Sequence, residues 1–131
     1  MPVEYRYDST LKAVVTKVTG TMEEGEVLTH LRKLRDDTSI PNGFVEVVDF
    51  SAADDFAVKV SGAGRISFLI PELQDRKDYR GTMFFAPGDL AFGIARVFQT
   101  MLEQLGIETE IHREWGELEA AVARRSTSDG T

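Results

Sequence analysis

Short apolar runs alternate along this chain with longer stretches of helical spacing, and the alternation predicts where strands and helices lie. The runs 3–8 and 11–20 are rich in Val and Tyr. They flank the turn residues Asp8, Ser9 and Thr10, which predicts an antiparallel hairpin. The runs 44–50 and 81–86 are mostly apolar, as in strands covered on both faces, whereas 107–112 alternates like an edge strand. Segment 51–60 has no clear pattern.

Four stretches have the spacing of helices with one buried side. Thr21 and Glu24 match a capping box at the start of the first, and Pro71 predicts that the second ends or kinks near Ile70. The third runs from Asp89 to Leu105 and has Gly106 placed to end it. The expected buried stripes are Val27, Leu28, Leu31 and Leu34; Ile66, Leu69, Ile70 and Leu73; Ile94, Val97, Phe98, Met101 and Leu105; and Trp115, Leu118 and Val122.

The predicted order is β-β-α-β-α-β-α-β-α. An initial hairpin followed by alternating strands and helices predicts an α/β fold with a single mixed, mostly parallel sheet and helices packed against it. The length of 131 residues suits one hydrophobic core, so we expect one domain over residues 1–125 and a disordered tail over 126–131. The residues expected to be nearly buried are Leu31, Val47, Phe84, Ile94 and Val97.

Composition excludes several function classes. The formal net charge is −7 and the Lys and Arg residues are scattered, which argues against nucleic acid as a partner. The chain has no cysteine, so disulfides and thiolate metal sites are excluded. His30 and His112 have no ordered set of partners in the sequence. We therefore expect both at the surface or its boundary, and we expect no metal or cofactor.

The ends and the hydropathy of the chain bear on its location. The first eight residues lack the basic and apolar regions of a signal peptide. No apolar run approaches the roughly 20 residues of a membrane helix. We expect a soluble, cytoplasmic protein without an integral membrane segment.

The segment VKVSGAGR, residues 58–65, has glycines spaced like those of a phosphate-binding loop. A dinucleotide fingerprint needs a third glycine where Ser67 stands, and a Walker A loop needs a Gly-Lys-Ser/Thr sequence that is absent. Two interpretations remain. Ser61 either caps the second helix through its hydroxyl group, or it is a serine that is itself modified.

The second interpretation comes from a resemblance. Asp49-Phe50-Ser51 after a central strand and Ser61-Gly62-Ala63-Gly64 at the start of a helix resemble the STAS domain of anti-sigma-factor antagonists and sulphate transporter tails. In that family the strand ends in an Asp-aliphatic-Ser pattern, and the serine before the first glycine is phosphorylated. The resemblance implies a STAS-like fold and a switch at Ser61. The longer loop looks more like a divergent branch of small bacterial proteins that are sometimes grouped with lipid-binding Sec14-like folds.

A second candidate lies in PGDLAFG, residues 87–93. We expect Asp89 to cap the third helix after a Pro-Gly turn. Leu90 and Phe92 fall off the expected buried stripe. They are either core residues or an apolar contact site at the carboxyl end of the sheet, where open α/β sheets bind ligands. Arg96, one turn beyond Phe92, would add a cation at its rim.

These features favour a non-enzymatic regulatory or protein-binding module, because no nucleophile, base and orienting group occur as a set. Its partner would be another protein or a second copy of the chain. Its contact residues would include Gly62, Asp89, Leu90, Phe92 and Arg96. The alternative is a carrier or sensor of a small apolar or lipid-like ligand held between the sheet and its helices. A cavity lined by Phe68, Phe84, Phe85 and Phe92 would favour the carrier, and an exposed patch near Phe92 would favour the docking module.

Overall fold

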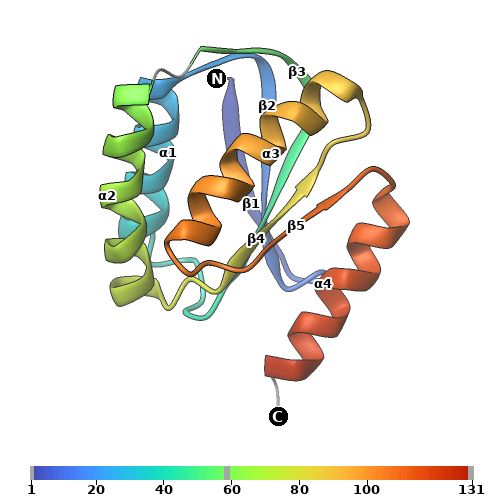
Figure 1. Ribbon diagram of the computed structural model, residues 1–131. Coiled ribbons are helices and arrows are strands. Elements are labelled where there is room, and N and C mark those ends of the chain that lie inside the picture. The colour runs from blue at the N-terminus through green and yellow to red at the C-terminus, as the bar shows by residue number, and fades with distance from the viewer. Residues whose placement is uncertain (1, 58–59, 130–131) are drawn as a thin grey trace.

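The computed structural model describes residues 2–57 and 60–129, and side chains except those of 60–63 and 126–129. It shows one five-stranded sheet with strands in chain order (Figure 1). The strands are β1 (Val3–Asp8), β2 (Ala13–Glu23), β3 (Val45–Ala57), β4 (Gly81–Phe85) and β5 (Thr109–His112). β1 pairs antiparallel with β2, and the other neighbours are parallel. The predicted mixed, mostly parallel α/β sheet is confirmed.

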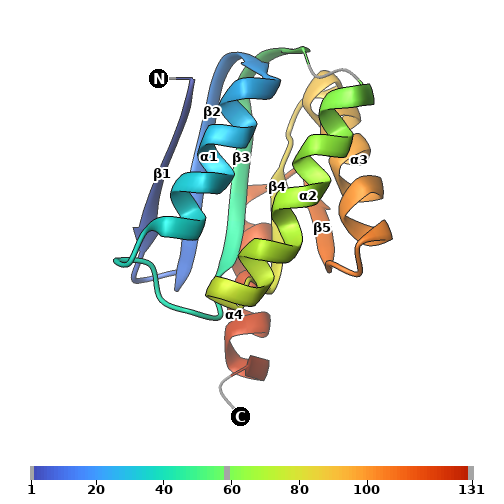
Figure 2. The same cartoon turned by 90° about the vertical axis from the view of Figure 1, so that its left-hand side faces the viewer.

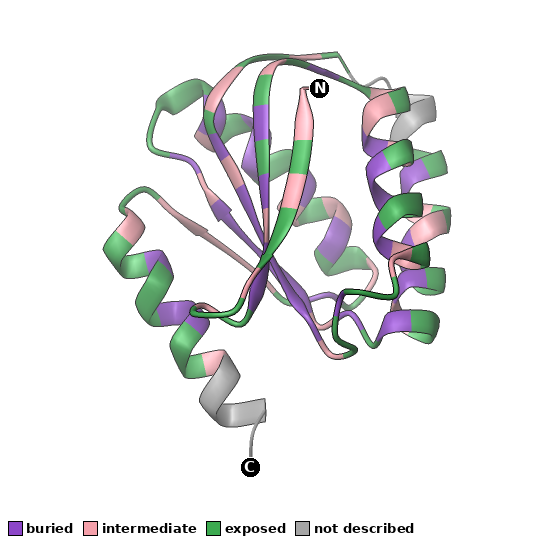
Figure 3. Ribbon diagram, turned by 180° about the vertical axis from the view of Figure 1, so that it is seen from behind, coloured by how far each residue is buried: buried purple, intermediate pink, exposed green. Residues whose placement is uncertain are grey.

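Helices cover the two faces of the sheet unequally. α1 (Glu24–Asp36), α2 (Val60–Lys77) and α3 (Asp89–Gln104) lie side by side on one face (Figure 2). α4 (Trp115–Asp129) packs on the other face, against β4 and β5, and leaves much of β1 and β2 uncovered there (Figure 3). The connections from β2 to β3, from β3 to β4 and from β4 to β5 each place their helix on the same face of the sheet. The main core therefore lies between the sheet and α1–α3. The domain boundary at residue 125 stays a prediction, although α4 continues to Asp129.

The central strand is longer than the sequence indicated. Phe44, Val47 and Phe50 are buried, as expected for a strand covered on both faces. The strand then continues to Ala57, because the last residues of β2 extend beside it in parallel, with two shifts of register. The Asp49-Phe50-Ser51 segment therefore lies inside β3 and not at its end, and residues 51–57, which show no clear pattern in the sequence, are strand.

The start of α1 differs from the sequence prediction, and of the two alternatives predicted at Pro71, an end or a kink, the end is excluded. Thr21 is paired in β2, and Glu23 precedes α1 with no side-chain hydrogen bond to the helix, so the predicted capping box is wrong. The residues expected to start the helix instead belong to the end of β2, which pairs with β3. α2 continues past Pro71 to Lys77, because Leu73 and Lys77 on its inner side remain buried. Packing against the core thus outweighs the backbone bond that proline removes.

Of the five residues expected to be nearly buried, only Val97 is not, and Leu28, Leu69 and Trp115 of the expected stripes are partly buried. Leu31, Val47, Phe84 and Ile94 are buried, whereas Val97 is 64% exposed. The buried side of this helix consists of Ala91, Ile94, Ala95, Phe98 and Leu102. The two small alanines let the helix approach the sheet closely. Residues 90–98 are apolar on more than one side of the helix, so the spacing of apolar residues alone placed Val97 on the buried side. Gly106 ends α3 at a φ of +78°, and the Ile107 N–H donates to the Leu102 carbonyl at 3.0 Å, which confirms the predicted C-cap.

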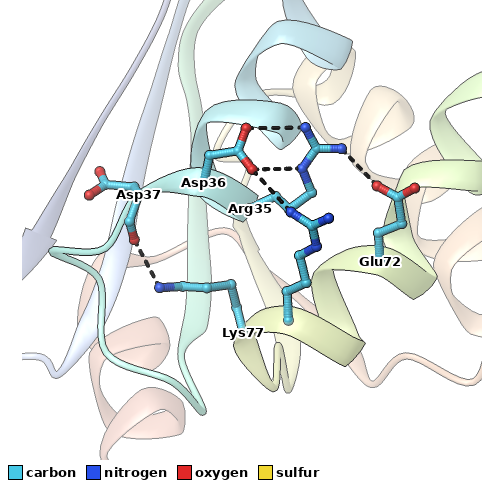
Figure 4. Close-up of polar contacts among 6 residues, drawn as sticks. Arg35, Asp36, Asp37, Glu72 and Lys77 are labelled. Atoms are coloured by element: carbon cyan, nitrogen blue, oxygen red, sulfur yellow. Dashed lines mark hydrogen bonds and ion pairs between the residues drawn. The ribbon is translucent and has the colours of Figure 1, made fainter.

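Polar contacts tie the C-terminal end of α1 to α2 (Figure 4). The Arg35 guanidinium donates to Glu72 at 2.7 Å and pairs with its neighbour Asp36. The buried Lys77 ammonium donates to the backbone carbonyls of Asp37 at 2.8 Å and Ile40 at 2.7 Å. These bonds satisfy carbonyls after the end of α1 and fix the chain that enters β3.

Candidate functional site

Two places in the fold gather candidate chemistry. One is the exposed corner where β4 leads into α3, at the carboxyl end of the parallel strands. The other lies inside the main core, where polar side chains from β2, α1, β3 and β4 line a cavity.

The corner is held by contacts between α3 and the turn that precedes α4. Gly88 caps α3 without a side-chain bond, so Asp89 is not the cap that the sequence predicted. Its carboxylate is almost fully exposed and accepts a hydrogen bond from Arg113 at 2.9 Å. The same guanidinium lies over the Phe92 ring, 4.3 Å from its centre. The cation at Phe92 is therefore Arg113, which the sequence analysis missed because it lies 21 residues further along the chain.

Leu90 is the apolar residue of this corner whose side chain is exposed to solvent. It is 57% exposed, whereas Phe92 is half-buried. Leu90 and Val97 are seven residues apart in α3, which places both on the same side of the helix. We call these two residues the exposed α3 flank. Of the two residues that the sequence left open between core and surface, Leu90 is therefore exposed, and its role as a contact residue stays a prediction. Arg96 is exposed as well, but its role at the rim stays a prediction.

The other sequence candidate lies at the border of the described residues. α2 begins at Val60, so Ser61 is in its first turn and does not precede the helix. The side chain of Ser61 and the surroundings of Gly62 lie outside the described part of the structure. Phosphorylation of Ser61 stays a prediction.

The buried polar cluster was not anticipated. Glu46, at the start of β3, is 5% exposed. Its Oε2 lies 2.6 Å from the His30 Nε2 and accepts a hydrogen bond from the Thr16 hydroxyl at 2.5 Å. His30 is 8% exposed, so its expected surface position is wrong. It lies three residues after Val27 and four before Leu34, within the buried stripe of α1. The edge of the Tyr5 ring packs against the imidazole at 5.5 Å between ring centres.

Two further hydroxyl groups complete this cluster. Thr82 pairs directly with Glu46 across β3 and β4, and its side chain is hydrogen-bonded to the Tyr79 hydroxyl. Burial and the nearby Glu46 carboxylate raise the pKa of Tyr79, so its phenol stays neutral and available as a donor. We call Thr16, His30, Glu46, Tyr79 and Thr82 the polar pocket wall.

The polar pocket wall does not have the geometry of a hydrolytic triad. In a triad the nucleophile and the acid contact opposite nitrogens of the imidazole ring. Here Thr16 and Glu46 both approach Nε2, Thr16 at 3.4 Å, and the Thr16 hydroxyl already donates to Glu46. His30 is therefore not placed to activate Thr16 as a nucleophile.

The wall borders a cavity of about 70 Å³ between the sheet and α1–α3. The rest of its lining is apolar and includes Val18, Ile66, Ile70, Phe84 and Phe98. Of the four phenylalanines expected around a ligand cavity, only Phe84 lines this one. Phe68 is exposed on α2, Phe85 packs on the α4 side against Trp115, and Phe92 lies at the corner.

Comparisons with known proteins agree with this architecture. No protein-family model and no curated protein matches the sequence. The structure of the anti-sigma factor antagonist SpoIIAA in its unphosphorylated form matches 93% of this chain and 97% of its own, with a TM-score of 0.56 at 16% identity. The chain has a SpoIIAA-like fold. This is the fold of STAS domains, so the expected fold class is confirmed.

A second SpoIIAA-like structure is similar over most of its length. An uncharacterised protein of the DUF3478 family from Shewanella loihica matches 88% of this chain and 87% of its own, with a TM-score of 0.52 at 14% identity. None of the helices that the structure describes has the length and hydropathy needed to cross a bilayer.

Proposed function

We propose that this chain is a non-enzymatic regulatory module that binds another protein through the exposed α3 flank and the adjoining corner. The observation that carries the proposal is the exposure of Leu90 and Val97, at 57% and 64%, on a side of α3 that adjoins its buried side. Exposed apolar side chains that share a helix face are typical of protein contact sites. The SpoIIAA structure supports a protein-binding role, since that protein is an anti-sigma factor antagonist.

The corner supplies polar contacts beside these apolar residues. Arg113 is fixed by Asp89 and by the face of Phe92, so its guanidinium is held in one orientation before a partner arrives. A charged group held in advance loses less side-chain freedom on binding. We therefore expect the partner to present an apolar surface with a carboxylate at its edge, which Arg113 can meet.

If the exposed α3 flank is the docking surface, substitutions there should lower the affinity for the partner and leave the stability of the fold unchanged. The double variant Leu90→Glu, Val97→Glu should weaken partner binding by about tenfold or more, because two charges enter an apolar contact. Its melting temperature should stay close to that of the unchanged protein, since both side chains are exposed and Glu is a good helix former. The measurement is isothermal titration with a purified partner, identified first by capture on the immobilised chain.

Ala120→Glu is the matched control, because Ala120 is exposed on α4, on the opposite face of the sheet. It should leave binding unchanged. Equal binding by the double variant and the unchanged protein would remove the α3 flank from the proposal. Sedimentation at increasing concentration tests the alternative partner, a second copy: a dimer abolished by the double variant would place the chain itself on this surface.

We further propose that phosphorylation of Ser61 switches this binding, as the STAS resemblance implies. Ser61 lies in the first turn of α2, where free backbone N–H groups and the helix dipole favour a phosphate. The added charge would repel an acidic group on the partner. Ser61→Asp should therefore weaken partner binding at least severalfold, and Ser61→Ala should leave it near its original value. Ser51→Asp, on an exposed residue of β3, is the control; equal weakening by both aspartates would contradict a specific switch.

The cavity supports a second function, the binding of a small, largely apolar ligand. Its lining comes from the sheet and from all three helices of the main face, as a ligand held between sheet and helices requires. A cavity of about 70 Å³ is roughly half the size of the engineered apolar cavities that hold benzene. The ligand that fits is therefore a small molecule and not a long lipid chain.

A further inference from the structure

The polar pocket wall narrows the chemistry of that ligand, and this inference rests on the second proposed function. A purely apolar ligand would gain nothing from five polar residues on the wall, and burying their side chains away from water costs free energy. Each of them therefore needs a hydrogen-bonding role in the core or toward an occupant. The hydrogen bonds that these side chains already make show which donors and acceptors remain unused.

Acceptor capacity is left on Glu46. Both hydrogen bonds to its carboxylate fall on Oε2, from Thr16 at 2.5 Å and beside the His30 Nε2 at 2.6 Å. Within the described part of the structure, Oε1 accepts none. A carboxylate has about four acceptor positions. Glu46 can therefore accept a further hydrogen from a group inside the cavity.

Donor capacity is left on the two hydroxyl groups next to Glu46 in the wall. The hydroxyl groups of Tyr79 and Thr82 share one hydrogen bond, so one of their two hydrogens remains unused. An occupant that both donates and accepts through one small group would satisfy Glu46 and this pair together. A hydroxyl group does both.

The surroundings of the cluster favour an uncharged head group. His30 Nε2 already lies 2.6 Å from Glu46 Oε2, so that oxygen is engaged before a ligand enters. A ligand carboxylate would meet Glu46 as a like charge. A ligand ammonium would bring three donors and a further charge into an otherwise apolar lining, where one unused carboxylate oxygen cannot satisfy them all. An uncharged head group avoids both costs.

We infer that the polar pocket wall binds the hydroxyl group of a small uncharged alcohol, and that the apolar lining holds its hydrocarbon part. The hydroxyl donates to Glu46 and accepts from the Tyr79–Thr82 pair. The cavity of about 70 Å³ suits a branched body of roughly three to five carbons, judged against the size of cavities that hold benzene. The hydrocarbon lies near Val18, Ile66 and Ile70.

Two probes of the same shape test the inference in the unchanged protein. Isobutanol and 1-chloro-2-methylpropane have the same number of heavy atoms, but only the first carries a hydroxyl group. NMR should show saturable shifts of the Val18 and Ile66 methyl signals with both. Only isobutanol should also shift the ring nitrogen signals of His30. His112, on β5, is the sole other histidine of the sequence, and it serves as an internal reference that should not move.

Variants of the wall make the test specific. Glu46→Gln should lower the affinity for isobutanol about fivefold or more, the loss expected for one hydrogen bond to a charged group, and leave the chloride unaffected. Glu110→Gln is the matched control, because Glu110 lies 3.2 Å from His112 in a second Glu–His pair outside the cavity. If Glu46→Gln does not fold, the double variant Tyr79→Phe, Thr82→Val removes both hydroxyl groups of the donor side of the wall, with Tyr5→Phe as a control for the loss of a phenol outside the cavity.

The outcomes separate this inference from the proposed function on which it rests. Entry of the chloride without isobutanol, or an isobutanol affinity unchanged by the wall variants, would overturn the alcohol site while the apolar cavity stands. Binding of neither probe would overturn both. Isobutanol binding that shifts the His30 signals and weakens in Glu46→Gln supports both.

Discussion

Replacing Glu46 with alanine should lower the free energy of unfolding by about 2–5 kcal/mol, because it removes the shared acceptor of a buried hydrogen-bonded cluster. Glu46 is 5% exposed and is the acceptor for Thr16 and the partner of His30. Alanine would leave the Thr16 hydroxyl and the imidazole without their acceptor in the core. Urea unfolding followed by circular dichroism measures the change.

Two controls separate the lost pair from a general loss of packing. Glu110→Ala breaks the pair with His112, in which the Glu110 side chain is 43% exposed, and should cost under about 1 kcal/mol. The double variant Glu46→Leu, His30→Leu removes both partners and should recover much of the stability, because an apolar pair needs no compensation. A double variant less stable than Glu46→Ala would contradict this account of the cluster.

Phe50→Ala should destabilise the protein by a similar amount, about 3–5 kcal/mol, as in other buried Phe→Ala changes. Phe50 is 1% exposed, and its ring stacks on Phe84 at 5.6 Å and on Phe98 at 6.1 Å. These rings join β3, β4 and α3. The variant would therefore open a cavity beside the one already present, and the midpoint of urea unfolding should fall.

Phe68→Ala is the matched control for this prediction. Phe68 is 82% exposed on α2, and its truncation should change the free energy of unfolding by less than about 0.5 kcal/mol. A large loss from Phe68→Ala with little loss from Phe50→Ala would place the main core elsewhere.

The elements of this protein follow from its local pattern. The apolar run at Phe44, the long helix from Asp89 and the glycine at 106 each carry a signal that depends only on neighbours in the sequence, and each is confirmed. The alternation of these elements also predicted the mixed sheet, because crossovers between parallel strands have few alternatives.

Only part of the candidate site could be predicted from the sequence. Glu46 interrupts an apolar strand, and His30 falls at helical spacing between Val27 and Leu34, so both positions carried a signal of buried polar chemistry. Neither signal names a partner. Leu90 was left open between core and surface and is exposed, whereas Val97 was assigned to the core and is exposed as well, because an apolar helix offers more than one face.

The sequence by itself thus determined the order and type of the elements and the strand at the centre of the sheet, since these depend on periodicity, turn residues and caps within a few positions. Only the tertiary structure decided which side of α3 is buried, how far β3 extends and which groups meet. Thr16, His30 and Glu46 are joined by strand register and helix packing across 14 to 30 residues. Arg113 reaches Asp89 across 24 residues in the same way. The physical reason is that contacts between distant segments depend on how whole elements pack, and local pattern carries no record of that.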